Sequence, residues 1–377
     1  MRVILDGRLI LPHMTGVGRY LFGLCQGLTA IGHAQFIELW LQADLPSNHP
    51  AWELGKDGFI IKRVRYPHMS VSGQLRLPLD LLRASPDLLH YPHFDLPWLT
   101  PGRIVVTLHD LKYVAHPEFF PRYSRLRSML IRLMMMGALH RAQLVIVDST
   151  STAKDVQRLL KASPQKLRVV PLGVERRFFS PPDAKEDEKL LRRYKLNQPY
   201  ILFVGERRPH KNLRGLLQAF AILQRMSPLP CQLAIVGQPY APYREAEQIA
   251  ESLSIADRVR FLEHVPDLDL PGLYRAASAF ALLSYYEGFG LPVLEAMASQ
   301  TPVVVSNCAS LPEVAGDAAW IVPPGDPEQV AQALYTAIFD ESSRCERIQR
   351  GLARACQFTW ENTACLTYQI YQEALLH

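Results

Sequence analysis

Two glutamates, Glu287 and Glu295, frame a glycine turn in the segment EGFGLPVLE. The turn carries Gly288 and Gly290. An apolar run precedes it, and a helix and the buried strand TPVVVSN are predicted to follow. Glycines let a backbone approach an anion closely, and a helix N-terminus supplies free N–H groups and the positive end of a dipole. Because open α/β sheets bind ligands beyond the carboxyl ends of their strands, the turn predicts an anion site. The carboxylates flank that site and suit polar hydroxyl groups; the alternative is an ordinary turn with two surface glutamates.

A second candidate anion site follows the predicted strand at 200–204. Gly205 comes first, then a loop with Arg207 and Arg208, and Lys211 stands just before the next helix. Two cations at the head of a helix suit a diphosphate better than a solvated surface. We expect Lys211 and Arg207 to bind that diphosphate, whereas Arg208 can equally face solvent.

The first half of the chain holds a glycine loop of its own, Thr15–Tyr20, with the sequence TGVGRY. Its glycines, Gly16 and Gly18, fail as a dinucleotide fingerprint, because the third glycine position is Leu21 and no acidic residue ends a second strand about 20 residues later. This failure argues against an oxidoreductase. The alternative for the loop is a plain turn between strand and helix.

Polar residues also follow two predicted strands of the first half. His109 and Asp110 end the strand IVVTL, where the alternatives to a binding role are a capping pair or a core histidine. The residues His90, Tyr91 and His93 end the strand before it. For these three, contact with a ligand is one interpretation and a plain structural role is the preferred one.

The elements that position these residues alternate between strand and helix along both halves. A chain of 377 residues exceeds what one hydrophobic core usually supports, so two domains are expected. The alternation predicts an α/β fold with two parallel sheets in series. We place the first domain at 1–176, a charged linker at 177–198 and the second domain at 199–358, with a final helix over 359–376.

Composition excludes several classes of protein. Hydrophobic residues make up 48% and charged residues 20%, as in ordinary soluble proteins, and no apolar run reaches the roughly 18 residues of a membrane span. The N-terminus is too short and polar for a signal peptide, so a cytoplasmic location is expected. Six cysteines lack zinc-like spacing and are interpreted as reduced thiols. The net charge of +5 suits phosphorylated ligands or an anionic membrane and is too small to argue for nucleic acid.

The motifs together resemble one known family. EGFGLPVLE is similar to the EX7E element of the retaining GT-B glycosyltransferases of family 4, also known as glycosyl transferases group 1. The TGVGRY loop, PLGV at 171–174, PHKN at 209–212, SLPEVAGDAA and the terminal helix resemble elements of the same family, so the resemblance spans nearly the whole chain. One residue departs from it: the family's usual arginine before Lys211 is His210 here, and we expect Arg207 to supply that charge.

The resemblance implies two Rossmann-like domains facing a central cleft, with residues 359–377 crossing back to the first domain. The first domain would bind the acceptor and the second a nucleoside diphosphate sugar. A hexose would move to an acceptor hydroxyl with retention at the anomeric carbon, without metal or cofactor. Catalysis is expected from Glu287, His109, Lys211 and Arg207, with Glu287 and His109 on sugar hydroxyls. Donor binding is expected from Gly16, Gly18, Gly205, Val265, Gly288, Phe289, Gly290, Leu291 and Glu295, the last on the ribose.

The D-x-D spelled by Asp267 and Asp269 is interpreted as helix-start acids, so no metal ligand is expected. The motif combination is typical of mannosyltransferase-like members, so GDP-mannose is the first expected donor. The acceptor is expected to be a glycan or lipid-linked intermediate of cell-surface polysaccharide synthesis. Alternatives are a UDP-sugar-dependent glucosyl- or N-acetylglucosaminyltransferase, an epimerase or hydrolase of the same fold, and a non-catalytic glycan-binding domain. The oligomeric state stays open.

A predicted helix over 123–140 carries several arginines among Leu, Ile and Met: Arg122, Arg125, Arg127, Arg132 and Arg141. One interpretation is peripheral contact with an anionic membrane, at its inner face. The other is an internal domain helix with a basic outer face.

Overall fold

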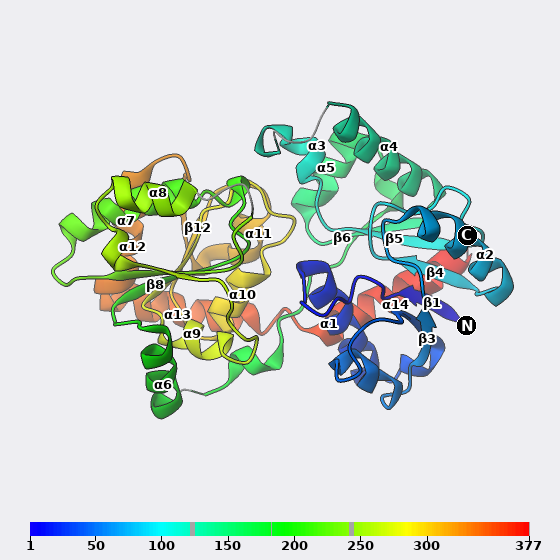
Figure 1. Cartoon of the computed structure of the whole chain (residues 1–377), viewed down its shortest axis with the longest axis horizontal. Helices are drawn as coiled ribbons and strands as arrows, with labels where there is room; N and C mark the ends of the chain where they lie inside the picture. The colour runs from blue at the N-terminus through cyan, green and yellow to red at the C-terminus, as the bar shows by residue number, and fades with distance from the viewer. Residues whose placement is uncertain (121–124, 182, 241–244, 377) are drawn as a thin grey trace. The chain divides into compact units, whose positions relative to one another are not determined.

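The computed structural model describes residues 1–120, 125–181, 183–240 and 245–376 (Figure 1). The chain divides into two compact units. Unit 1 comprises residues 1–173 and 359–377, and unit 2 comprises residues 174–358. The residues predicted as a linker, 177–198, thus fall in unit 2. Their helix α6 (Ala184–Tyr194) is joined to α9 (Leu270–Ala276) by an ion pair of 2.5 Å between Asp187 and Arg275.

Unit 1 is built on a fully parallel sheet of seven strands in the order β3-β2-β1-β4-β5-β6-β7. Short apolar runs such as LVIV in β6 are buried throughout, as expected for a sheet covered on both faces. The strands are β1 (Val3–Asp6), β2 (Ile37–Gln42), β3 (Ile60–Val64), β4 (Leu88–Tyr91), β5 (Ile104–Leu108), β6 (Leu144–Val147) and β7 (Leu167–Val169). The helices are α1 (Gly16–Ala30), α2 (Val71–Ala84), α3 (Lys112–Ala115), α4 (Arg125–Arg141), α5 (Thr150–Leu160) and α14 (Trp360–Leu376).

Unit 2 repeats the plan with six parallel strands in the order β10-β9-β8-β11-β12-β13. The strands are β8 (Tyr200–Val204), β9 (Gln232–Val236), β10 (Val259–Leu262), β11 (Ala279–Leu282), β12 (Val303–Ser306) and β13 (Trp320–Val322). Besides α6 and α9, its helices are α7 (Leu213–Met226), α8 (Glu245–Ser252), α10 (Leu291–Ala298), α11 (Leu311–Ala315), α12 (Pro327–Phe339) and α13 (Glu341–Ala355). The order of connection reverses between β8 and β11, so the loops after these two strands lie side by side at the carboxyl edge.

The terminal helix α14 belongs to unit 1 and packs along α1 (Figure 1). Trp360, at its start, fills a space left by three glycines. A Cβ added to Gly23 would lie 2.1 Å from the Trp360 indole, and one added to Gly27 or Gly173 would lie 2.1 or 2.3 Å from the Trp360 backbone. Contacts this close leave no room for any other residue type at the three positions.

Two sequence predictions about helices are modified by the structure. Helix α13 was not predicted, and the irregular stretch 43–86 contains β3 and the full helix α2. Of the predicted basic helix, Arg122 and Tyr123 lie outside the described residues, and α4 runs on to Arg141. Within the described ranges, no helix combines the length and apolar character needed to cross a bilayer.

Candidate active site

The loops after β8 and β11 bring a lysine and a glutamate together in unit 2. Lys211 Nζ lies 2.5 Å from Glu287 Oε1, and Ser284 Oγ donates to the same oxygen at 2.5 Å. Both charged side chains are mostly buried, with exposed fractions of 15% and 13%. Two residues predicted from separate motifs therefore form one charged pair at the switch point of the sheet, where doubly wound sheets bind ligands.

Backbone contacts fix the two loops against each other. The amide of Tyr285 donates to the carbonyl of His210 at 2.8 Å. Ser310 Oγ donates to the carbonyls of Glu287 (3.0 Å) and Phe289 (2.8 Å), which holds the glycine turn in place. These bonds orient the Lys211 and Glu287 side chains before any ligand arrives, the condition under which polar groups stabilise a transition state most effectively.

Glycine is required where this turn enters α10. Gly290 has φ +102°, and a Cβ there would lie 2.6 Å from a methyl group of Leu311. Helix α10 begins at Leu291 with a proline in its first turn, where a missing N–H costs nothing. Gly205 adopts φ +155° after β8, and its carbonyl lies only 2.0 Å from where a Cβ of Gly237 would be. The predicted donor-binding residues Gly205, Gly288, Phe289, Gly290 and Leu291 thus all lie on the two loops or at the start of α10.

Glu295 lies on α10 and is only 4% exposed. Its Oε2 accepts a hydrogen bond of 2.8 Å from the hydroxyl of Tyr274 on α9. Sequence reasoning did not identify Tyr274, since a tyrosine inside an apolar helix carries no signal of such a role. The contact fixes one oxygen of the carboxylate.

Arg207 is turned toward α8. Its side chain is 1% exposed, and its Nη1 lies 2.5 Å from Glu247 Oε1. Its Nε donates to the carbonyl of Gly237 at 3.1 Å, and the guanidinium covers the ring of Phe261. The structure therefore places Lys211 beside Glu287, and holds Arg207 in a separate ion pair. Arg208, the residue for which a solvent-facing role was open, pairs with Glu206 at 2.7 Å.

The acidic pair near β10 is part of the packing of unit 2. Asp269 Oδ2 accepts from Arg193 Nη1 at 2.9 Å and from the Tyr194 hydroxyl at 2.5 Å. The backbone carbonyl of Asp267 accepts from Arg177 at 3.1 Å. Val265, one of the predicted donor-binding residues, is half-buried in the loop between β10 and α9.

In unit 1, His109 is oriented by a buried carboxylate. Its Nδ1 lies 2.8 Å from Asp148 Oδ2, and the ring of Tyr20 meets it edge-on at 4.6 Å. Burial raises the pKa of Asp148 above its ordinary value, against the lowering effect of His109. In the part of the chain that the structure describes, the buried Nε2 of His109 has no hydrogen-bond partner. The tautomer in which Nδ1–H donates to Asp148 would leave Nε2 as a hydrogen-bond acceptor.

The glycine loop of unit 1 starts α1. Thr15 caps the helix by accepting from the amide of Gly18 at 3.3 Å. A Cβ on Gly18 would lie 3.1 Å from the carbonyl of Leu9, whereas one on Gly16 would meet nothing within 4 Å. Packing therefore explains a glycine at 18, and it leaves open space over Gly16.

His90 has a core role, as the preferred interpretation held. It is fully buried, with Nδ1 at 2.6 Å from the Tyr371 hydroxyl and Nε2 at 2.7 Å from Thr107 Oγ1. Burial lowers the pKa of His90 to about 3, so the ring is neutral. It anchors α14 to β4 and β5.

Comparison with known proteins places the chain in a family. The family model for glycosyl transferases group 1 matches residues 185–354, and the model for Glycosyltransferase Family 4 matches residues 14–178. The O-antigen chain mannosyltransferase B of Escherichia coli is 32% identical over 389 residues, which cover 99% of this chain and 100% of that protein. The chain belongs to glycosyltransferase family 4. It is therefore a transferase, as predicted.

Other relatives of this glycosyltransferase differ in their named substrates. MMP alpha-(1->4)-mannosyltransferase of Mycolicibacterium hassiacum is 31% identical over 61% of this chain and 54% of that protein. D-inositol 3-phosphate glycosyltransferase of Corynebacterium urealyticum is 27% identical over 95% of this chain and 90% of that protein. The crystal structure of Anabaena HepE in complex with UDP and glucose has a TM-score of 0.78 at 18% identity, covering 99% and 100% of the two chains. That likeness confirms the predicted GT-B fold.

Proposed function

We propose that this glycosyltransferase moves mannose from GDP-mannose to a hydroxyl of a glycan or lipid-linked acceptor in cell-surface polysaccharide synthesis, with retention at the anomeric carbon. The observation that carries the proposal is the contact between Lys211 and Glu287 at the switch point of unit 2. The donor is favoured by two relatives that are named mannosyltransferases, one of which matches along its whole length.

The proposed chemistry uses Lys211 as the partner of the leaving diphosphate. When the bond between the anomeric carbon and the phosphate oxygen breaks, negative charge grows on the diphosphate. Lys211 and the backbone amides at the start of α10 stabilise that charge electrostatically, in place of a metal. The guanidinium of Arg207 forms an ion pair with Glu247. Arg207 can therefore bind the diphosphate only if this ion pair breaks.

Glutamates and a histidine position the donor in this proposal. A diphosphate drawing Lys211 away leaves Glu287 free to accept from sugar hydroxyls, while Ser284 still orients it. Glu295, whose Oε2 accepts from the Tyr274 hydroxyl, accepts from the ribose hydroxyls. His109 Nε2 accepts from a sugar hydroxyl. The acceptor oxygen attacks the anomeric carbon on the face that the diphosphate leaves, and its proton passes to the departing phosphate oxygen.

Calorimetric titration with GDP, GDP-mannose, UDP, UDP-glucose and UDP-N-acetylglucosamine, each with and without EDTA, tests the donor. We expect a preference for the guanosine ligands that EDTA does not change. A preference for uridine ligands would favour a UDP-sugar-dependent transferase. That alternative is suggested by the structural relative that was crystallised with UDP and glucose. Donor consumption without acceptor would indicate an epimerase or hydrolase, and no nucleotide binding would indicate a glycan-binding domain. The anomeric configuration of the product, measured by NMR, tests retention.

We also propose that α4 contacts an anionic membrane, which would locate the enzyme at the inner, cytoplasmic face. Large apolar side chains on the outer side of α4 are exposed: Leu126, Met129, Leu130, Leu133 and Met136. Arg127 and Arg132 are exposed among them. An apolar strip with interspersed cations matches the acyl and headgroup layers of such a surface. The internal-helix alternative predicts a basic outer face, and the exposed leucines and methionines favour the membrane.

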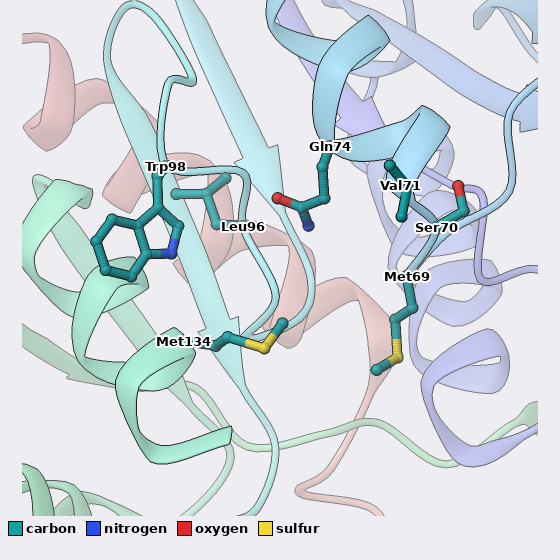
Figure 2. Close-up of a pocket in the computed structure, with 7 residues that line it drawn as sticks. All are labelled: Met69, Ser70, Val71, Gln74, Leu96, Trp98 and Met134. Atoms are coloured by element: carbon teal, nitrogen blue, oxygen red, sulfur yellow. The ribbon is translucent and has the colours of Figure 1, made fainter. Parts of the chain in front are cut away.

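The apolar surface continues beyond α4. Helix α2 exposes Val71, Leu75, Leu79 and Leu82. Between the two helices lies a pocket of about 290 Å³, lined by Met69, Ser70, Val71, Gln74, Leu96, Trp98 and Met134. In Figure 2, Trp98 and Met134 face Met69 and Val71 across this hollow. An apolar hollow within an apolar surface supports contact with a lipid or a lipid-linked acceptor.

A further inference from the structure

Three metal-ligand side chains meet in unit 1 outside the residues assigned to transfer. His68 follows β3, and His93 and Asp95 follow β4. One ring nitrogen from each histidine and one carboxylate oxygen all lie within 4.8 Å of one another. Strands β3 and β4 are separated by β2 and β1 in the sheet, so the cluster links two loops from non-adjacent strands.

Several of these polar atoms are buried without hydrogen bonds. The His68 side chain is 4% exposed, and among the described residues neither of its ring nitrogens has a hydrogen-bond partner. The same holds for Oδ2 of Asp95, whose side chain is fully buried. Buried polar groups in folded proteins are nearly always hydrogen-bonded, so an imidazole and a carboxylate oxygen that both lack hydrogen bonds require an explanation.

Charge also suits a cation. Asp95 supplies the one carboxylate of the cluster, and the nearby Asp6 and Arg8 form a buried ion pair of 2.6 Å that balances itself.

We propose that His68, His93 and Asp95 bind a divalent transition-metal ion, with Zn²⁺ the ion that this donor set fits best. Two imidazoles and a carboxylate are common zinc ligands, and at bond lengths of about 2.0–2.1 Å their donor atoms lie roughly 3.3 Å apart around a tetrahedral ion. His68 Nε2 is 3.3 Å from Asp95 Oδ1. His93 Nδ1 is 2.6 Å from the same oxygen, a hydrogen bond that opens when the ion takes the place of the proton. Water fills the fourth position.

Neighbouring groups support the ligands. The Tyr91 hydroxyl donates to Asp95 Oδ1 at 3.3 Å, and the Tyr91 ring stacks on His68. Gln74 Nε2 donates to the backbone carbonyl of Asp95 at 3.0 Å, from the wall of the apolar pocket (Figure 2). Such outer contacts orient metal ligands and raise affinity. The His93 side chain is 18% exposed, which gives an ion a route from solvent. The bound ion would fasten the loop before α2 to the loop after β4, apart from the transfer chemistry.

Titration of ZnCl₂ into the tag-free full chain, stripped of metal with a chelator and dialysed, tests the site. We expect one equivalent to bind, and His93→Gln and Asp95→Asn each to weaken that binding by at least about 100-fold, since even outer-shell changes cost 10- to 100-fold. At a hundredfold excess over Kd, Zn²⁺ should raise the Tm of the wild-type chain by roughly 5 °C and that of His93→Gln much less. Co²⁺ in place of Zn²⁺ should give the visible absorption of a tetrahedral site in wild type only.

His116→Gln is the matched control. His116 Nδ1 lies 2.8 Å from Glu118 in the same unit, and among the described residues this imidazole–carboxylate pair belongs to no group of three candidate metal ligands. This variant should bind Zn²⁺ as the wild type does. The proposal is overturned if wild type binds no stoichiometric Zn²⁺, or if His93→Gln and Asp95→Asn bind it as tightly as wild type while circular dichroism shows all chains folded.

Discussion

Lys211 Nζ lies 2.5 Å from Glu287 Oε1, although 76 positions separate the two residues in the sequence. The contact exists because β8 and β11 are neighbours at the point where the order of connection in unit 2 reverses. The proposed partners of the diphosphate and of the sugar hydroxyls are therefore adjacent before a donor binds. Each neutralises the other in the meantime, so neither is a lone buried charge.

Lys211→Ala and Glu287→Ala should each lower turnover at least about a hundredfold, the usual effect of removing one group that stabilises transition-state charge. Steady-state kinetics with the preferred donor measure the effect, and circular dichroism checks that the fold survives. Lys189→Ala is the control, because Lys189 forms an exposed pair with Glu186 at 2.6 Å on α6. Near wild-type rates in both site variants would show that the assignment of the site is wrong.

The stability of unit 1 should fall as the pH drops below 6.5. The pKa of His90 is about 3 in the fold, against an ordinary value of 6.5. Between these values the unfolded chain binds a proton that the folded chain does not, so the free energy of unfolding decreases with decreasing pH, by about 2 kcal/mol at pH 5 from this residue alone. Urea unfolding at pH 7.5 and pH 5 measures the loss. Tryptophan fluorescence suits it, because Trp40, Trp52, Trp98 and Trp360 all belong to unit 1.

His90→Gln should reduce that pH-dependent loss by about 2 kcal/mol, because the group that titrates is gone. His68, whose pKa is about 4 for the same reason, keeps its own share in the variant. Between pH 7.5 and pH 5, the control variant His116→Gln should lose as much unfolding free energy as the wild type. An equal loss in His90→Gln and wild type would contradict the neutral, buried state of His90.

Gly23→Ala should destabilise unit 1 by about 3 kcal/mol, since the added methyl would overlap the Trp360 indole and overpacking typically costs 1–3 kcal/mol. Thermal unfolding followed by tryptophan fluorescence reports the change. Gly16→Ala on the same helix is the comparison, because a Cβ there meets nothing within 4 Å. If Gly23→Ala and Gly16→Ala have the same Tm, α14 does not pack on α1 as described.

Leu126→Glu combined with Leu130→Glu should abolish most co-sedimentation with vesicles that contain phosphatidylglycerol. The two side chains are 70% and 54% exposed on α4, so charge is added to the exposed apolar strip with little effect on the core. Leu229→Glu, at a 54% exposed leucine of unit 2, should leave vesicle binding unchanged. Vesicles of phosphatidylcholine alone should bind the wild type less. Equal sedimentation of wild type and the double variant would rule out α4 as the contact.

Local signals in the sequence predict much of this fold. Buried strands appear as short apolar runs, and the turns at Gly205 and Gly288–Gly290 follow them directly, so two parallel sheets with loops at their carboxyl edges can be expected. Residues 177–198 fall in unit 2 rather than in a linker, because the charged residues of α6 pair with neighbours there, as Asp187 does with Arg275. Helix α13 was missed because charged and small residues make up most of it and few of its side chains are buried.

Contacts between distant residues lie beyond such signals. That Asp148 orients His109 depends on β5 and β6 being neighbours, and nothing local marks the aspartate as a partner. Arg207 shares a loop with Lys211, yet its direction is set by Glu247, 40 residues further on. His68 lies alone in an irregular stretch, and only the fold brings it to Asp95.

The packing of Trp360 against Gly23, Gly27 and Gly173 also has a consequence for the order in which the two units fold. Residues 1–173 emerge from the ribosome first, but the helix that covers α1 is made only after all of unit 2. Domains fold as units during synthesis. The contiguous unit 2 can thus complete its core while the earlier-made residues still expose an apolar groove. Unit 1 is therefore started before unit 2 and completed after it. A chaperone that shields α1 would act before Trp360 has been synthesised.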